Sequence, residues 1–476
     1  MKFVSTRGGT KQATFEETLF SCYCQDGGLF VPEAVPEISK NTLRDWSKLS
    51  FVELAQRIAR LYIDEDEIPT NEINGCIERA FMHFSHPGIA PVVKLRGGLN
   101  ILELFHGRTL AFKDIALSFV GELLEYFLKR RRKRVIIVVV TSGDTGSAAI
   151  ESVKGKEFID IVVFLPHRGC SEIQVLQMVT VIEDNVHVFK VENLGEVDVA
   201  VNRLSRDQTF TKQNGFMSVN STNWARIMMQ IVHYFYGYLQ VCPNADEEME
   251  FVVPTGACGN IAAGIYAKQM GLPVKFVCAG NLNDIVARTI SKGHYSVSPV
   301  MSTLAPAMDI QYPYNLERVM YVLSGADHVL IAAMYKEFEL SDAISVPRTL
   351  VEKLKSVIGT HTADDDRIKV VMRQCWEEQA YLVCPHTAVG LSYYYQQIDR
   401  KDEKCEGQTT SRICIATASP EKFPEALTSA GLTPKKSPKL ASLEKRPTKF
   451  EIVPANEDCE DFMRAVISRI SQMRKK

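Results

Sequence analysis

The chain has 476 residues, of which 46% are apolar and 24% are charged. This composition is ordinary for a globular protein with two or three domains and sizeable cores. The formal net charge is −2, so no overall positive field exists to attract nucleic acid or an acidic membrane surface. We therefore expect neither nucleic acid nor a membrane as a partner.

The amino-terminal segment has no apolar core of a secretory signal, and Glu16 and Glu17 are unusual in an acid-poor transit peptide. The longest purely aliphatic run, residues 135–140, is far too short to cross a bilayer. Twelve cysteines are scattered without paired zinc-finger spacing, which favours reduced thiols over disulfides or a metal site. We expect a cytoplasmic protein without a bound metal.

The first part of the chain differs in pattern from the rest. A turn cluster at residues 26–28 is followed by helical patterns at 51–63 and 73–84, with no strand rhythm between them. We predict that residues 1–95 form a separate N-terminal lobe.

From about residue 130 short β-branched runs alternate with longer helical patterns. The strand-like runs are 135–140, 161–164, 186–191, 251–253, 274–279 and 413–417, and the helix candidates are 114–129, 171–179, 223–239 and 260–270. This alternation predicts an α/β fold with mainly parallel sheets. We divide it into one domain at 96–250 and a second at 251–476, and expect the polar stretch 360–367 to be a surface loop.

The basic run at residues 129–134 has two interpretations. A cluster of lysine and arginine can bind nucleic acid. Here it ends a predicted helix, where cations complement the negative end of the helix dipole, and we favour this second interpretation.

Three segments have the residue types of a chemical site. Residues 250–260 (EFVVPTGACGN) predict a strand and a glycine turn that opens a helix, which suits a compact phosphate. Lys113 lies among apolar residues at a helix start, where lost solvation lowers the pKa of an amine and favours a Schiff base. Residues 141–147 (TSGDTGS) follow a predicted strand and can form a nest of N–H groups for a carboxylate.

Each segment alone also has an ordinary explanation. These explanations are a plain strand-to-helix turn, an exposed lysine at a helix start, and a Ser/Thr helix cap. Together the three segments are the parts needed to bind an amino acid through pyridoxal phosphate.

The sequence also resembles the threonine synthases, in order, over nearly the whole chain. The matching motifs are STRG at 5–8, DGGLFVP at 26–32, TLAFKD at 109–114, TSGDTG at 141–146, NSTNWAR at 220–226 and PAMD at 306–309. The resemblance implies a fold type II pyridoxal-phosphate enzyme, similar to the tryptophan synthase β chain, with pyridoxal 5′-phosphate as its cofactor.

The resemblance also implies a role for particular residues. Lys113 would hold the cofactor as a Schiff base, and Thr417 would face the pyridine nitrogen. The cofactor phosphate would lie among Gly256, Ala257, Cys258, Gly259 and Asn260. Substrate would be bound by Ser142, Gly143, Asp144 and Thr145 at its α-carboxylate, and by Asn223 and Arg226 at its distal phosphate.

Four sites depart from the family pattern. Ala257 and Cys258 replace Asn-Phe, Tyr314 replaces a serine, Ser419 replaces a histidine, and Arg108 replaces a proline. Tyr314 and Ser419 put the final addition of water in doubt. We therefore expect a phospho-lyase that converts O-phosphohomoserine, and as a second candidate O-phosphothreonine, to 2-oxobutyrate, phosphate and ammonia.

Two alternatives and one property stay open from the sequence. The first alternative is a true threonine synthase, and the second is a catalytically silent interaction or signalling protein on the same fold. The oligomeric state, monomer or homodimer, is also open.

Overall fold

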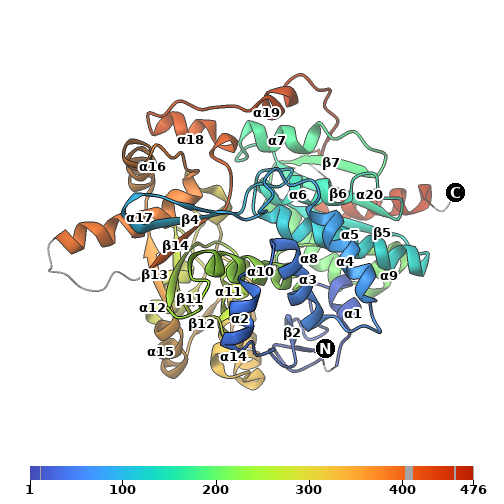
Figure 1. Cartoon of the computed structure of the whole chain (residues 1–476). Helices are drawn as coiled ribbons and strands as arrows, with labels where there is room; N and C mark the ends of the chain where they lie inside the picture. Colours follow the sequence, from blue (N-terminus) through green and yellow to red (C-terminus); the bar gives the residue numbers. More distant parts are fainter. Residues whose placement is uncertain (11, 403–410, 455–456, 475–476) are drawn as a thin grey trace.

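The computed structural model describes residues 1–10, 12–402, 411–454 and 457–474. Two mainly parallel sheets with helices around them make up most of the molecule, and the N-terminal segment, which contains α1–α4, is blue in Figure 1. Within the described ranges, no helix is both long and apolar enough to span a bilayer. The eleven described cysteines are all free.

The larger sheet has six strands. Their spatial order is β13 (Ile358–Thr362), β10 (Val274–Gly280), β9 (Met249–Pro254), β14 (Arg412–Ala416), β4 (Leu99–Glu103) and β3 (Val92–Lys94). All neighbouring pairs are parallel except β3 and β4.

The second sheet has five strands, and all its pairs are parallel. Their order is β15 (Glu451–Ile452), β7 (Val186–Val191), β6 (Ile159–Pro166), β5 (Val135–Val140) and β8 (Phe216–Met217). Central strands such as β5 (VIIVVV) are apolar without alternation because helices bury both faces of a parallel sheet. Two small antiparallel pairs complete the strands: β1 (Phe3–Ser5) with β2 (Phe30–Pro32), and β11 (His294–Ser296) with β12 (Ala343–Ser345).

The helices of the first half include three that begin with a capping box, at Thr14, Ser50 and Ser171, where reciprocal side-chain bonds satisfy free N–H groups. The full set of described helices in the first half is α1 (Phe15–Phe20), α2 (Lys40–Trp46), α3 (Phe51–Tyr62), α4 (Thr70–Phe81), η1 (Arg96–Gly98), α5 (Lys113–Arg131), α6 (Asp144–Val153), α7 (Glu172–Val179), α8 (Leu194–Arg206), α9 (Gln208–Asn214) and α10 (Trp224–Val241).

The helices of the second half cover the six-stranded sheet and then return to the five-stranded one. They are α11 (Gly259–Gln269), α12 (Ile285–Lys292), η2 (Pro306–Met308), α13 (Leu316–Ser324), α14 (His328–Ser341), α15 (Arg348–Val357), α16 (Asp365–Gln379), α17 (Pro385–Asp402), η3 (Pro420–Lys422), α18 (Pro424–Ser429), α19 (Pro438–Leu443) and α20 (Cys459–Met473). Helices α5 and α10 pack on each other, and in the N-terminal segment α3 packs on α10 while α4 packs on α5.

The α/β fold predicted from the sequence is confirmed, and each of the six strand-like runs contributes a strand. The sheets do not follow the proposed boundaries. Strands β3 and β4, at residues 92–103, join the sheet of the later segment, while β15 and α20 return to the five-stranded sheet (Figure 1). The expectation of a loop at 360–367 is wrong, because this stretch contains the end of β13 and the start of α16.

A buried arginine links the N-terminal segment to the rest of the molecule. The Arg318 guanidinium is fully buried and donates to the carbonyl oxygens of Phe30 and Thr222 and to Asn315 Oδ1, at 2.6–3.1 Å. Asn315 in turn donates to the carbonyl oxygens of Ser221 and Ala257. One side chain therefore fixes three separate segments.

We predict that Arg318→Leu lowers the free energy of unfolding by about 3 kcal/mol or more, because it leaves buried carbonyl groups without donors. Urea-induced unfolding measures the loss. The matched control is Arg348→Leu, whose side chain is 91% exposed and whose removal should cost within about 0.5 kcal/mol. Equal effects of the two variants would contradict a structural role for Arg318.

Candidate active site

A cavity of about 270 Å³ opens where strands of both sheets end. The loops that follow β5, β9 and β14 line it, as parallel strands present their carboxyl ends at one edge. Of the residues singled out from the sequence, the structure brings the following to this cavity: Lys113, Ser142, Asp144, Thr145, Arg226, Gly256, Ala257, Cys258, Gly259, Asn260 and Thr417.

Lys113 is the first residue of α5, and a backbone bridge fixes it relative to Thr417. The Phe112 N–H donates to the Thr417 carbonyl oxygen at 2.8 Å, and Ala111 forms an antiparallel bridge with Ala418. Lys113 and Thr417 therefore enter the cavity from two segments that are hydrogen-bonded to each other.

A second set of bonds closes the turn before Lys113. The Asp114 carboxylate accepts from the Thr109 N–H at 2.8 Å and from the Thr109 hydroxyl at 2.7 Å. The Thr109 carbonyl accepts from Lys422 Nζ at 2.7 Å and from Gln177 Nε2 at 3.0 Å. The start of α5 is thus held rigidly, which a covalent attachment point needs.

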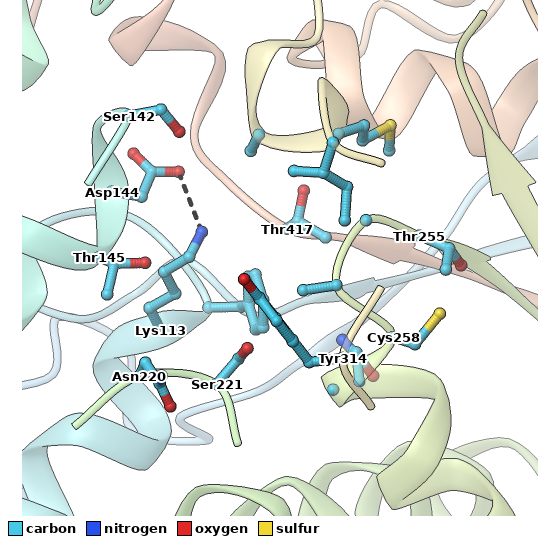
Figure 2. Close-up of a pocket in the computed structure, with 18 of the residues that line it drawn as sticks. Lys113, Ser142, Asp144, Thr145, Asn220, Ser221, Thr255, Cys258, Tyr314 and Thr417 are labelled. Atoms are coloured by element: carbon cyan, nitrogen blue, oxygen red, sulfur yellow. Dashed lines mark ion pairs between the residues drawn. The ribbon is translucent and has the colours of Figure 1, made fainter. Parts of the chain in front are cut away.

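Three charged groups lie next to one another at the inner end of the cavity. Lys113 Nζ is 3.8 Å from Asp144 Oδ2 (Figure 2), and the fully buried Lys422 Nζ is 2.7 Å from Asp144 Oδ1. Burial lowers the pKa of Lys113, and the Asp144 carboxylate opposes this only in part. Burial alone would raise the pKa of Asp144, but Lys422 and Lys113 outweigh it and hold that pKa well below its usual range. The neutral, nucleophilic form of the Lys113 amine therefore forms more readily than that of an exposed lysine.

The loop after β9 has the form of an anion site. Cys258 adopts a left-handed backbone (φ 60°) directly before α11 begins at Gly259, so the free N–H groups of a first helical turn face the cavity. A Cβ at Gly256 would lie 2.7 Å from the Ala307 carbonyl oxygen, so only glycine fits there. Asn260 Nδ2 is buried and has no hydrogen-bond partner in the described part of the chain. The loop therefore fits the phosphate of a cofactor.

Arg226 provides a second site for an anion in the same cavity. Its side chain is 3% exposed, and Nη1 donates to the Val219 carbonyl oxygen at 2.9 Å. Nε has no partner, and no carboxylate forms an ion pair with Arg226, among the residues described. Burial lowers the pKa of Arg226 to about 10, so the group is still charged near neutral pH. A buried cation without an anionic partner is costly, which favours a ligand that brings negative charge.

The structure does not bring Asn223 to the cavity. Its Oδ1 accepts from the Ala225 N–H as the cap of α10, and its Nδ2 donates to the Leu19 carbonyl oxygen at 2.8 Å. Both ends of the amide are therefore occupied within the protein. Asn220 and Ser221, from the same motif, line the cavity instead (Figure 2).

Gly143 and Ser419 are also absent from the cavity lining. Gly143 has φ 146°, and a Cβ there would lie 2.6 Å from the Gln174 side-chain carbon Cδ, so this glycine permits a tight turn. The Ser419 hydroxyl caps η3 by accepting from the Glu421 N–H. Tyr314, in contrast, points into the cavity with Lys113 (Figure 2).

The sequence interpretation missed several residues of this region, and three of them have specific contacts or positions. Lys422 and Gln174 both contact the Asp144 carboxylate, and His386 lines the cavity. Nothing in the residue pattern around a single lysine, glutamine or histidine indicates that folding will bury it beside a charged group. Across the described residues, no group of three His, Cys, Asp or Glu side chains could hold a metal ion.

Three family models match the chain in sequence order. They are the threonine synthase N terminus at residues 2–81, the pyridoxal-phosphate dependent enzyme at 86–334, and the threonine synthase C-terminal model at 387–466. The fold is that of a fold type II pyridoxal-phosphate enzyme, and the cofactor is pyridoxal 5′-phosphate. The chain belongs to the threonine synthase family.

Individual relatives match the chain over all or most of its length. Threonine synthase-like 2 of Xenopus laevis is 46% identical, with 99% of each chain covered. Threonine synthase of Schizosaccharomyces pombe is 36% identical and covers 90% of this chain and 88% of its own. The structure of pyridoxal-phosphate-bound threonine synthase from Brucella melitensis has a TM-score of 0.91 at 32% identity, covering 99% of this chain and 100% of that one. The resemblance to the threonine synthases expected from the sequence motifs is confirmed, and threonine synthase-like 2 proteins are among the relatives.

We predict that Asp144→Asn moves the pH profile of cofactor attachment to lower pH. The Asp144 carboxylate raises the pKa of Lys113 against the effect of burial, so its removal lowers that pKa and leaves the amine neutral at lower pH. The measurement is the rate at which the cofactor-free protein gains visible absorbance with pyridoxal phosphate, as a function of pH. Glu151→Gln, on the same helix but paired with Lys154, is the control, and identical profiles for both variants would contradict the assignment.

Proposed function

We propose that the protein is a phospho-lyase that converts O-phosphohomoserine to 2-oxobutyrate, phosphate and ammonia, with O-phosphothreonine as a second candidate substrate. One observation carries the proposal. An unpaired buried guanidinium, Arg226, lines the same cavity as Lys113, whose pKa burial lowers. The phosphate of a phosphorylated amino acid would pair with Arg226. Its amino group would react with the cofactor that Lys113 holds. We expect the reaction to take place in the cytoplasm.

The chain's own residues divide the work of binding the cofactor. Lys113 would hold it covalently, the loop Gly256–Asn260 would hold its phosphate, and the Thr417 hydroxyl would face its ring nitrogen. When bound, pyridoxal phosphate withdraws electrons from the α-carbon of an attached amino acid. The Thr417 hydroxyl is neutral, so it would leave the ring nitrogen largely unprotonated and would moderate this withdrawal.

The substrate's two anionic ends would lie on different segments. The N–H groups at the start of α6, which begins at Asp144, would bind the α-carboxylate. Arg226 would pair with the distal phosphate, for which its planar guanidinium is suited. The freed Lys113 amine would take one proton from Cα and one from Cβ, the Cγ–O bond would break with its electron pair leaving on phosphate, and a proton would be returned to Cγ to form the methyl group.

Both threonine and 2-oxobutyrate formation consume one water, and they differ in where that water adds. Addition at Cβ inside the cavity gives threonine, whereas release of the unsaturated product and addition at Cα in solution gives 2-oxobutyrate and ammonia. The Tyr314 ring occupies the cavity, and its hydroxyl donates to Asp198 at 3.3 Å. Burial raises the pKa of Tyr314, so the phenol stays protonated and is no base for the water. These features support release without hydration.

The alternative of a true threonine synthase has support from the 36% identical relative of that name. Product analysis separates the two activities. The purified protein is incubated with O-phosphohomoserine, and threonine, 2-oxobutyrate and phosphate are quantified by chromatography. We expect 2-oxobutyrate in large excess, and threonine as the main product would reject the proposal in favour of the synthase. A protein that binds cofactor but releases no phosphate would support the silent interaction protein.

We predict that Tyr314→Ser raises the share of threonine several-fold. Removing the ring opens space for a water near Cβ, and misplacement of a reacting group by about 1 Å can cost on the order of a hundredfold. Tyr314→Phe is the control, because it keeps the ring and loses only the bond to Asp198. An increase in both variants would show that the hydroxyl, and not the ring, decides the product.

We predict that Arg226→Ala raises KM for O-phosphohomoserine more than about tenfold, since a charge-assisted contact contributes roughly 1.5–3 kcal/mol. Cofactor content should stay unchanged, because Arg226 would touch only the substrate. Steady-state kinetics and the visible absorbance of the purified variant measure the two effects. Lost cofactor with an unchanged KM would place Arg226 at the cofactor instead.

A further inference from the structure

We propose that His386 donates a hydrogen bond through Nδ1 to an anionic oxygen of the ligand bound in the active-site cavity. His386 is the second residue of α17, is 4% exposed and lines the cavity. None of the roles described above uses it. The proposal rests on the cofactor and an amino acid occupying this cavity, and is independent of which product is released.

The two nitrogens of the His386 ring have different surroundings. Nε2 accepts a hydrogen bond from the Ala307 N–H at 3.0 Å, so this nitrogen carries no proton. A neutral imidazole then has its proton on Nδ1. Nδ1 is buried and has no hydrogen-bond partner in the ranges that the structure describes. Because His386 lines the cavity, a buried N–H donor at the cavity wall is left without an acceptor, which a bound ligand would provide.

The ring acts as a neutral donor and not as an acid. Burial lowers the pKa of His386 to about 4; Asp144 opposes the shift, while Lys113 and Lys422 add to it. The imidazolium is thus absent near neutral pH. The helix N-terminus at which His386 lies disfavours a positive charge as well.

The accepting atom must lie on the side of the cavity near Lys113. The charges of Asp144, Lys113 and Lys422 all act on the His386 ring, so the ring is close to the place where the amino acid joins the cofactor. Two anionic oxygens are available there, the phenolate oxygen of the cofactor ring and the carboxylate of the bound amino acid. Both are strong acceptors for a neutral N–H.

The Nε2 side of the ring has a structural role that the test must separate. Ala307 donates to Nε2, and its carbonyl oxygen packs against Gly256, where a Cβ would approach to 2.7 Å. His386 therefore also positions η2 against the phosphate loop. A variant that destroys the whole ring would disturb both functions at once.

Two substitutions separate the contact made by Nδ1 of His386 from the contact made by Nε2. In His386→Gln the side-chain amide reaches the position of Nε2, keeps an acceptor for Ala307 and loses the Nδ1 donor. In His386→Asn the shorter amide takes the place of Nδ1, keeps the donor and loses the bond to Ala307. Thermal unfolding of both proteins, loaded with cofactor, measures any general loss of structure.

The measurements use no turnover, so they do not depend on the product that the enzyme forms. Spectral titrations give the affinity for pyridoxal phosphate and then for L-2-aminobutyrate, which has a carboxylate but no leaving group. A loss of about tenfold or more in His386→Gln is expected, with His386→Asn close to the parent protein. A shifted cofactor spectrum without amino acid identifies the phenolate as acceptor, and a loss confined to L-2-aminobutyrate identifies the carboxylate. Equal losses in the two variants, no loss in either, or a loss only in His386→Asn would overturn the proposal.

Discussion

The backbone bridge between Ala111 and Ala418 joins the two halves of the molecule at the cavity. On one side of it, α5 begins and leads into the five-stranded sheet; on the other, β14 of the six-stranded sheet has just ended. The relative positions of Lys113 and of Thr417, the residue expected at the ring nitrogen, therefore do not depend on how the sheets pack at a distance. Their separation is set by hydrogen bonds one and two residues away, and this local constraint makes a covalently held cofactor compatible with loops from two sheets.

Charge balance at the inner end of the cavity follows from the same region. Asp144 is buried between Lys113 and Lys422, and burying one carboxylate without a partner would be strongly unfavourable. Attachment of the cofactor to Lys113, as proposed, would change the charge of Lys113, and the Lys422–Asp144 contact at 2.7 Å would still balance the carboxylate. Lys422 also donates to the Thr109 carbonyl oxygen, so one ammonium group balances the charge and closes the turn before α5.

The strand at 135–140 was predictable because strands buried on both faces are continuously apolar, and the strand at 274–279 is apolar at every position except Lys275. β13 was not, since the sequence IGTHT resembles a loop and becomes a strand only by pairing with β10. The site likewise contains some residues that local sequence predicts and others that only tertiary packing brings there. Lys113 and the loops after β5 and β9 follow from motifs with a local meaning, whereas Lys422 and His386 are single residues whose surroundings arise from tertiary packing. Asn223 was misplaced because its motif offers two asparagines three residues apart, and sequence alone does not tell which one caps α10.

Three hydrogen-bond donors without partners determine which kind of ligand suits the cavity. Asn260 Nδ2, Arg226 Nε and His386 Nδ1 have no partners within the described chain, and they come from α11, α10 and α17. The first lies at the loop that fits a phosphate, the second beside Asn220 and Ser221, and the third near Lys113. A ligand that satisfies all three must carry acceptors at three separated points. A cofactor and a phosphorylated amino acid joined to each other have this arrangement, with one phosphate at each end and a carboxylate or phenolate between them. The chain has a net charge of −2, so the attraction for such an anion comes from the placement of these few groups and not from the overall charge of the protein.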